Sequence, residues 1–277
     1  MDYKSAEPAG QDIVLTGLKR FSLENILNCG QCFRWSGANG VYSGVARGRR
    51  LEVYLSGDAL VLRNMSLPAF ETVWKSYFDL ERDYGALHRL FSLDETMRKA
   101  LAFSPGLRVM RQEPWETLIT FILSQNNHIA RIKGIVARLC ENFGAALPGE
   151  GFAFPSPERL AVLSEDDLAP LRCGYRSAYL LDAARRVCDG RLDLPAFFAL
   201  PSEEICKQLL RVHGVGIKVA ECVLLYGFGR VERFPLDVWM KRVMRAYYPE
   251  GFPAEWAEVA GIAQQFLFHY IRNRTSD

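Results

Sequence analysis

Long apolar runs are absent from this chain of 277 residues: none reaches the length of about 18 residues that predicts a membrane-spanning helix. Internal repeats and low-complexity tracts are absent too. The formal net charge of +2 is too small to indicate a polyanionic partner by itself, although a local basic face is compatible with it. The segment 1–11 is polar, unlike a signal peptide, and predicts that the chain stays in the compartment where it is made. Composition therefore excludes a membrane span and predicts no function.

Cysteine is scattered and odd in number, with seven residues in all. Without a secretory signal, this pattern predicts free thiols in a reducing cell interior. Cys29 and Cys32 form a C-x-x-C pair, which could be a redox pair or half of a zinc site. No second pair follows at metal-binding spacing, and no helix is predicted to begin there. The sequence therefore predicts no metal and no cofactor.

The first part of the chain carries short, alternating runs typical of strands. Asn39-Gly40 and Gly57-Asp58 are dipeptides that favour tight hairpin turns. We therefore predict an antiparallel sheet over about residues 11–65. The expected strands are 13–15, 32–35, 41–45, 50–55 and 59–62.

After residue 68 the apolar period changes to that of helices. Phe70, Val73, Trp74, Tyr77 and Phe78 form one helical face. An α+β fold follows, with an N-terminal antiparallel β-sheet domain (1–112, with flanking helices) before an all-α domain (113–277). The expected later helices are 114–125, 129–143, 175–189, 202–211, 219–227, 238–248 and 253–273.

The segment 209–220 is the most informative. A helix runs into Gly214-Val215-Gly216, and a second helix follows at once. Glycines allow a sharp turn and close approach of another chain, and the new helix offers unpaired N–H groups that suit a phosphate. Taken alone, such a turn can be purely structural. A dinucleotide-binding loop is disfavoured because no strand precedes it and the third glycine is missing.

Lys218 lies just inside this second helix, and Asp237 follows nineteen residues later at the expected N-cap of the next helix. This combination resembles the helix-hairpin-helix DNA glycosylases with lyase activity, with the element spanning about residues 203–228. The resemblance implies that Lys218 attacks the sugar C1′ as an amine and that Asp237 stabilises the positive charge that develops there.

The likeness covers nearly the whole chain and is closest to the eukaryotic-type 8-oxoguanine DNA glycosylase/AP lyases. Gly30-Gln31-Cys32-Phe33-Arg34-Trp35 resembles the family segment in which the glycine carbonyl accepts the N7–H that 8-oxoguanine has and guanine lacks. The helix around 260–268 resembles the family's C-terminal pocket helix, which returns to the first domain. The resemblance implies base-binding roles for Gly30, Cys222, Gln264 and Phe268.

A second set of positions resembles the family's DNA contacts. Asn126 would fill the hole left by the flipped base, Tyr175 would wedge the stack, and Arg131 with Arg176 would hold the orphaned cytosine. The residues His213, Gly214, Val215, Gly216 and Trp239 would contact the DNA backbone. Departures occur at His213, where the family usually has Pro, at Trp239, where animal members commonly have His, and at Ile262, where an aromatic residue is often found.

The resemblance implies a bifunctional enzyme that excises 8-oxoguanine, preferably opposite cytosine, through a Lys218 Schiff base and β-elimination. The expected partner is double-stranded DNA containing oxidised guanine, with no membrane partner and a monomeric state. The expected location is the cytoplasm or nucleoid of a prokaryote or the nucleus of a eukaryote. A monofunctional alkyl-purine glycosylase and a non-catalytic helix-hairpin-helix DNA binder are the alternatives. Iron–sulfur relatives are excluded because no cysteine follows Cys222.

Overall fold

The computed structural model describes residues 2–149 and 151–274. The described chain forms two compact units. The first holds the residues up to Gly44, Leu51–Arg111 and the residues from Val231 onward, and the second holds Val45–Arg50 and Gln112–Arg230. The sequence-based boundary between residues 112 and 113 stays a prediction for the folding domains. Among the described residues, no helix is both long and apolar enough to cross a membrane.

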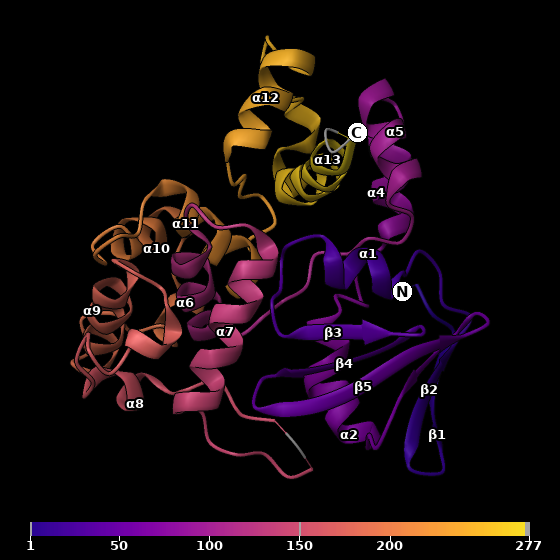
Figure 1. The fold of residues 1–277 in the computed structure, drawn as a ribbon. Helices are drawn as coiled ribbons and strands as arrows, with labels where there is room; N and C mark the ends of the chain where they lie inside the picture. Colours follow the sequence, from indigo (N-terminus) through magenta and orange to yellow (C-terminus); the bar gives the residue numbers. More distant parts are fainter. Residues whose placement is uncertain (1, 150, 275–277) are drawn as a thin grey trace. The chain divides into compact units, whose positions relative to one another are not determined.

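The sheet has six strands in the order β1-β2-β6-β5-β4-β3 (Figure 1). The first hairpin turn is confirmed, because Asn39 and Gly40 both have positive φ, at 53° and 79°. At the second turn only Gly57 does, at 61°. The strands are β1 (Ser5–Ala9), β2 (Asp12–Thr16), β3 (Trp35–Ala38), β4 (Val41–Ala46), β5 (Arg49–Ser56) and β6 (Ala59–Leu62).

Two strand predictions were wrong. Strand β1 was missed because it is polar and contains Pro8, which an edge strand tolerates. The expected strand over 32–35 begins only at Trp35. Upstream of it Gly30 takes the left-handed conformation, at φ 89°, and interrupts extended structure.

The core beneath the sheet is aromatic. The Trp35 Nε1–H donates to the Tyr77 hydroxyl at 2.8 Å, and the Trp74 ring meets the Tyr77 ring edge-on at 5.4 Å. Gly44 is required opposite Trp35, because a Cβ there would lie 2.4 Å from the indole ring. The predicted helical face of residues 70–78 is confirmed, although its first five residues form a π-helix.

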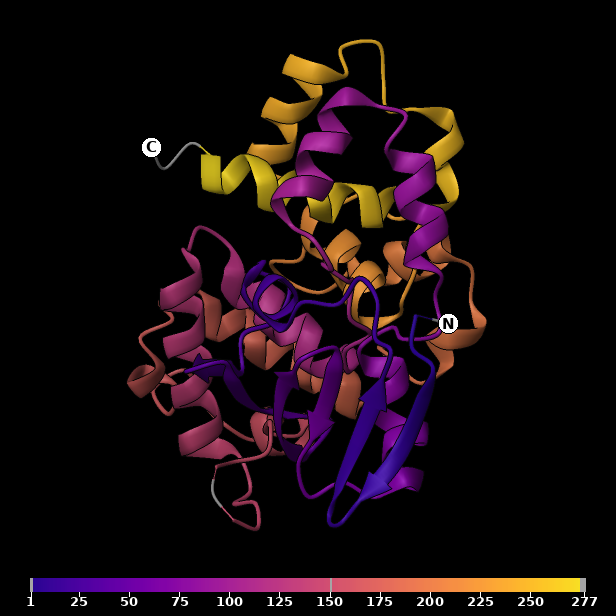
Figure 2. The same ribbon diagram turned by 90° about the vertical axis from the view of Figure 1, so that its right-hand side faces the viewer.

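The remaining elements of the first unit are helices, and the expected helix 253–273 is split into a 3₁₀ turn and a long α-helix. Helices α5 and α12 both pack against α13, the yellow helix of Figure 2. Sequence analysis missed α1, α4 and α5. The helices are α1 (Leu23–Asn28), α2 (Leu67–Ala69), η1 (Phe70–Trp74), α3 (Lys75–Tyr77), α4 (Tyr84–Phe91), α5 (Glu95–Phe103), α12 (Val238–Tyr247), η5 (Ala254–Val259) and α13 (Ala260–Arg274).

The second unit is helical around α6, which packs against α7, α9, α11 and η4. Most predicted helices are confirmed to within one or two residues at their ends. The expected helix 219–227 begins earlier, at Ile217, and its last five residues form a π-helix. The elements are α6 (Pro114–Ser124), α7 (Ile129–Phe143), α8 (Pro157–Ala161), η2 (Ala169–Leu171), α9 (Arg176–Cys188), η3 (Ala196–Ala199), α10 (Ser202–Leu209), α11 (Ile217–Cys222) and η4 (Val223–Gly227).

Candidate active site

The turn between α10 and α11 depends on its glycines for different reasons. Gly214 has φ 78°, and a Cβ there would lie 2.1 Å from a ring carbon of Tyr179. Both the backbone conformation and the lack of space therefore require glycine. Gly216 has an ordinary φ of −96°, and nothing lies within 4 Å of its Cβ position. As the N-cap of α11 it brings no side chain to the first N–H groups of that helix. The turn thus leaves helix N–H groups open to an anion.

Helix α9 supports this turn from the side. The backbone N–H of His213 donates to Asp182 Oδ2 at 2.8 Å, and the His213 ring meets the Tyr179 ring at 4.5 Å. Asp182 also pairs with Arg186 at 2.7 Å. Burial alone would raise the pKa of Asp182, but the hydrogen bond from His213 and the Arg186 guanidinium outweigh burial and hold the pKa below its usual range. The family usually has a proline, which has no N–H, where this chain has His213. The His213 N–H has a specific charged acceptor, Asp182.

We expect Asp182→Ala to weaken binding of undamaged duplex DNA several-fold, because the His213 N–H loses its acceptor, a contribution of about 1 kcal/mol. If only the negative charge of Asp182 mattered, its removal would strengthen binding to the negatively charged DNA instead. In a His213→Pro background the same change should matter much less, since no N–H remains. Asp189→Ala, which breaks an exposed pair with Arg191, is the control. Equal losses in both backgrounds, measured by fluorescence anisotropy, would contradict this role.

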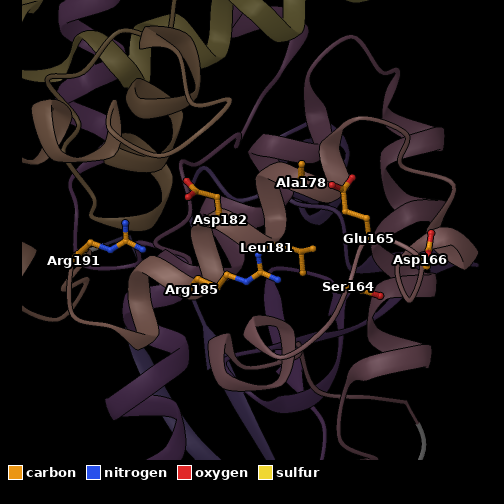
Figure 3. Close-up of a pocket in the computed structure, with 8 residues that line it drawn as sticks. All are labelled: Ser164, Glu165, Asp166, Ala178, Leu181, Asp182, Arg185 and Arg191. Atoms are coloured by element: carbon orange, nitrogen blue, oxygen red, sulfur yellow. The ribbon is translucent and has the colours of Figure 1, made fainter.

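Asp182 also lines a surface pocket of about 460 Å³ in the second unit. Figure 3 shows Asp182 and Arg185 among acidic and basic side chains that line it. Its lining residues, all within the described chain, include none of those predicted for catalysis or DNA binding. This pocket is therefore not the site that the sequence predicts.

Lys218 is the second residue of α11 and is half-buried. Its Nζ lies 5.1 Å from the centroid of the Phe121 ring. That ring belongs to α6 and stacks on Tyr226, with centroids 5.3 Å apart and planes 9° from parallel. The aromatic face attracts an ammonium group and so holds the Lys218 side chain in place while it is charged. Cys222, four residues on, lies on the same face of the helix and is buried.

Asp237 is the N-cap of α12, as predicted. Its Oδ1 accepts from the backbone N–H groups of Trp239 at 3.0 Å and Met240 at 2.8 Å. Capping uses one of the two carboxylate oxygens, and the side chain is half-buried. Burial lowers the pKa of Arg272, and the negative charge of Asp237 acts in the opposite direction. Asp237 is thus a fixed carboxylate at a helix N-terminus.

The loop around Gly30 is held by its neighbours. Gln31 is fully buried, and its amide Nε2 donates to the carbonyls of Ile26 at 2.9 Å and Arg108 at 2.8 Å. Its Oε1 accepts from the Met110 N–H at 2.9 Å. All three bonds are made with backbone groups. The Gln31 side chain is therefore a rigid anchor for the neighbouring residue Gly30, which is half-buried.

Helix α13 carries Gln264 and Phe268, four residues apart on one face. Gln264 is only 3% exposed, and its Oε1 is buried with no hydrogen-bond partner among residues 2–149 and 151–274. A buried amide oxygen in that state is costly unless a bound ligand satisfies it. Phe268 is partly exposed, and the Arg272 guanidinium carbon lies 5.4 Å from its centroid. This face of α13 is therefore a candidate ligand site.

The C-x-x-C pair has the properties of structural thiols. Cys29 and Cys32 are both buried, and each thiol donates to a carbonyl, of Ile26 at 3.3 Å and Leu27 at 3.6 Å. Burial raises the pKa of the Cys29 thiol to about 11. A redox pair needs a thiolate at neutral pH, so this geometry disfavours redox chemistry.

The residues predicted for the gap and the partner strand lie around the ends of α6, α7 and α9. Asn126 is exposed and takes the left-handed conformation, at φ 51°, between α6 and α7, which is the kind of strain found at functional sites. Arg131 is exposed on the first turn of α7. Tyr175 is 56% exposed at the start of α9.

Arg176 differs from Arg131 because it is only 5% exposed. Its Nε and Nη2 donate to the Gln125 carbonyl, and its Nη1 donates to the Cys173 carbonyl at 3.0 Å. Three of its five N–H donors are thus used on backbone. Its guanidinium also covers the Tyr175 ring at 4.4 Å. In this structure Arg176 fixes the loop that precedes Asn126.

The predicted residues divide between the two units. Lys218, Cys222, the turn residues 213–216 and the partner-strand set belong to the second unit, and Gly30, Asp237, Trp239, Gln264 and Phe268 belong to the first. Sequence analysis missed Phe121, Tyr179 and Asp182 as their supports. No motif or period signals them, because each acts on a residue far away along the chain.

Comparison with known proteins fits this geometry. Residues 13–118 match the family model "8-oxoguanine DNA glycosylase, N-terminal domain", and residues 119–251 match "HhH-GPD superfamily base excision DNA repair protein". The N-glycosylase/DNA lyase of Saccharomyces cerevisiae is 32% identical over 260 residues, which cover 82% of this chain and 68% of that protein.

Two solved structures match nearly the whole chain. MBOgg1 in complex with a low-affinity DNA ligand is 39% identical, with a TM-score of 0.94, and covers 99% of this chain and 100% of that one. The Clostridium acetobutylicum 8-oxoguanine glycosylase/lyase, solved with double-stranded DNA that has cytosine opposite 8-oxoguanine, is 33% identical, with the same TM-score and coverage. The chain belongs to the 8-oxoguanine DNA glycosylase/lyase family of helix-hairpin-helix base excision repair enzymes.

Proposed function

We propose that Lys218 and Asp237 carry out excision of 8-oxoguanine from duplex DNA and the strand cleavage that follows. The observation that carries the proposal is the position of Lys218, half-buried at the start of α11 and held over Phe121 directly after the Gly214–Gly216 turn. Only a neutral amine can attack C1′, so we expect DNA binding to move Nζ away from the ring face and the amine to give up any proton before the bond forms.

The covalent steps use these two residues, and the protons that the steps release or take up are exchanged with solvent water. As the C1′–N9 bond breaks, the base leaves and positive charge develops on the sugar, which the Asp237 carboxylate stabilises. The neutral Lys218 amine forms the new bond to C1′, and opening of the sugar ring gives a Schiff base. Water then takes a C2′ proton, the electron pair left behind forms a C2′–C3′ double bond, and the 3′ phosphate leaves with the electrons of the C3′–O bond, so that the strand is nicked.

Base recognition is assigned to Gly30, Gln264, Phe268 and Cys222. The Gly30 carbonyl would accept the N7–H of 8-oxoguanine and would repel the N7 acceptor of guanine. Gln264, whose buried Oε1 has no partner in the described chain, would satisfy that oxygen on the Watson–Crick edge of the flipped base. Phe268 would stack on one face of the base and Cys222 on the other.

The remaining DNA contacts follow from exposure and charge. The turn His213–Gly216 and the N-terminus of α11 would bind a phosphate, and Trp239 lies beside Asp237 for the phosphate next to the lesion. Exposed Asn126 would fill the gap, and Tyr175 would wedge the stack. Arg131 would read the orphaned cytosine. Arg176 would assist with the N–H groups that do not donate to the Gln125 and Cys173 carbonyls.

The remaining proposals concern assembly and place of action. One chain carries every residue assigned to chemistry and to DNA contact, which supports a monomer. The proposed substrate is double-stranded DNA containing oxidised guanine, so the proposed location is the cytoplasm or nucleoid of a prokaryote or the nucleus of a eukaryote.

The proposal predicts a strong preference for cytosine opposite the lesion. Cytosine offers O2 and N3 as acceptors to a guanidinium, whereas adenine presents a donor at N6. Arg131→Met is expected to reduce the ratio of single-turnover rates opposite cytosine and adenine by roughly 5- to 150-fold, at about 1–3 kcal/mol per contact.

Arg131→Lys separates base reading from phosphate binding. It keeps the charge and loses the planar fork, so the ratio should fall while duplex affinity is retained. Equal wild-type rates opposite cytosine and adenine would overturn this part of the proposal, and an Arg131→Lys ratio like that of wild type would reassign Arg131 to phosphate binding.

A further inference from the structure

Gln265, the neighbour of Gln264 on α13, points at a different part of the first unit. It is 1% exposed, and its Nε2 donates to the Cys29 carbonyl at 3.2 Å, across 236 positions of sequence. Cys29 directly precedes Gly30. The bond therefore joins the helix that carries Gln264 and Phe268 to the peptide unit before the lesion-reading glycine.

The loop is thereby anchored on both sides of Gly30. On the C-terminal side Gln31 is bonded to the carbonyls of Ile26 and Arg108 and to the Met110 N–H. On the N-terminal side the Cys29 thiol donates to the Ile26 carbonyl, and the Cys29 carbonyl accepts from Gln265. The anchors on Ile26, Arg108 and Met110 fix the loop to α1 and to the segment before α6. The bond from Gln265 ties the loop to α13.

Discrimination between 8-oxoguanine and guanine by one carbonyl is sensitive to position. A hydrogen bond prefers a donor–acceptor distance of about 2.9 Å and an angle above about 150°, and it weakens steeply below about 120°. A carbonyl that recedes from N7 therefore loses both the attraction to N7–H and the repulsion of a bare N7. Gly30 takes φ 89°, a region in which glycine has wide conformational freedom. Neighbouring groups must therefore supply the restraint.

We infer that Gln265 is a positioning residue for lesion discrimination: its amide sets Gly30 relative to the base-binding face of α13. The inference rests on the proposed function, since it concerns the same pocket. Gln265 does not touch the base in this scheme and acts through Cys29.

The test compares Gln265→Met, which keeps the length and removes the donor, with Leu267→Met, a volume-conserving change at another buried position of α13. Both are made in a Lys218→Gln background so that no turnover occurs, and Kd is measured for duplexes with 8-oxoguanine or guanine opposite cytosine. Gln265→Met is expected to reduce the ratio of the two Kd values roughly tenfold, for one hydrogen bond. Leu267→Met should leave the ratio unchanged.

The ratio stays informative if the variant is less stable, because an unfolded fraction lowers the apparent affinity for both duplexes equally. Gln265→Leu, which also removes the donor and keeps an apolar side chain at this buried position, should show the same loss. A separate measurement uses Gln265→Met with Lys218 intact and follows cleavage of an abasic duplex. This duplex lacks the base that Gly30 reads, so its cleavage rate should be affected less than the Kd ratio.

An unchanged ratio in folded Gln265→Met, or an equal change in Leu267→Met, would overturn the role of Gln265. Failure of the proposed function looks different. In that case the protein with Gln265 intact would itself bind the two duplexes equally, and a bulky substitution at Gly30 would change nothing.

Discussion

Lys218→Gln is expected to abolish covalent trapping of the protein on 8-oxoguanine duplexes by borohydride and to reduce strand cleavage by on the order of 10⁴-fold or more. Glutamine has no amine nucleophile, so neither the bond to C1′ nor the Schiff base can form. Duplex binding should persist, because the Gly214–Gly216 turn, its Asp182 support and the N-terminus of α11 are unchanged. Trapping is read by denaturing gel and affinity by anisotropy.

Lys207→Gln is the matched control, since it removes the same charge from α10 of the same hairpin. Its trapped product should resemble that of the wild type. Persistent trapping by Lys218→Gln would assign the nucleophile elsewhere. Base release by the wild type without any trapped product would indicate a monofunctional glycosylase, and binding without base release would indicate a structural DNA binder.

Asp237→Asn is expected to reduce single-turnover base excision by about 10²–10³-fold, the range found when one group that stabilises transition-state charge is removed. Duplex affinity should change only a few-fold, because the carboxylate acts as the sugar becomes cationic and not in the ground state. Asparagine is as good an N-cap as aspartate, and its Oδ1 can still accept from Trp239 and Met240. The free energy of unfolding should therefore stay nearly constant.

Asp83→Asn gives the comparison, because Asp83 caps α4 in the same way through the Ala86 N–H. It should leave both excision and affinity unchanged. If Asp237→Asn lost affinity as strongly as rate, or lowered the melting temperature enough to explain the rate, its role would be structural. Rate is measured with enzyme in excess over an 8-oxoguanine duplex, and stability is measured by thermal unfolding.

Much of the candidate site could be located from the sequence because its signals are local. An N-cap depends on residues within three positions, so Asp237 before a helical run sufficed to place the cap of α12. The Gly214-Val215-Gly216 turn likewise predicted the break between α10 and α11, with Lys218 on the first turn of the second helix. Helical periodicity located α6, α7, α9 and α10 for the same reason. Short elements with weak periods, such as α1, and the polar edge strand β1 escaped this reasoning.

The sequence by itself thus determined the family, the fold class and which residues are candidates for chemistry. Tertiary structure alone decided what holds them: the Phe121 ring under Lys218, Asp182 as the acceptor for His213, Gln265 on the Cys29 carbonyl, and Arg176 turned toward Gln125 and Cys173. Each of these contacts joins side chains or carbonyls from different elements. Their existence depends on how whole helices pack, and packing is set by the combined shape of many side chains rather than by any short pattern.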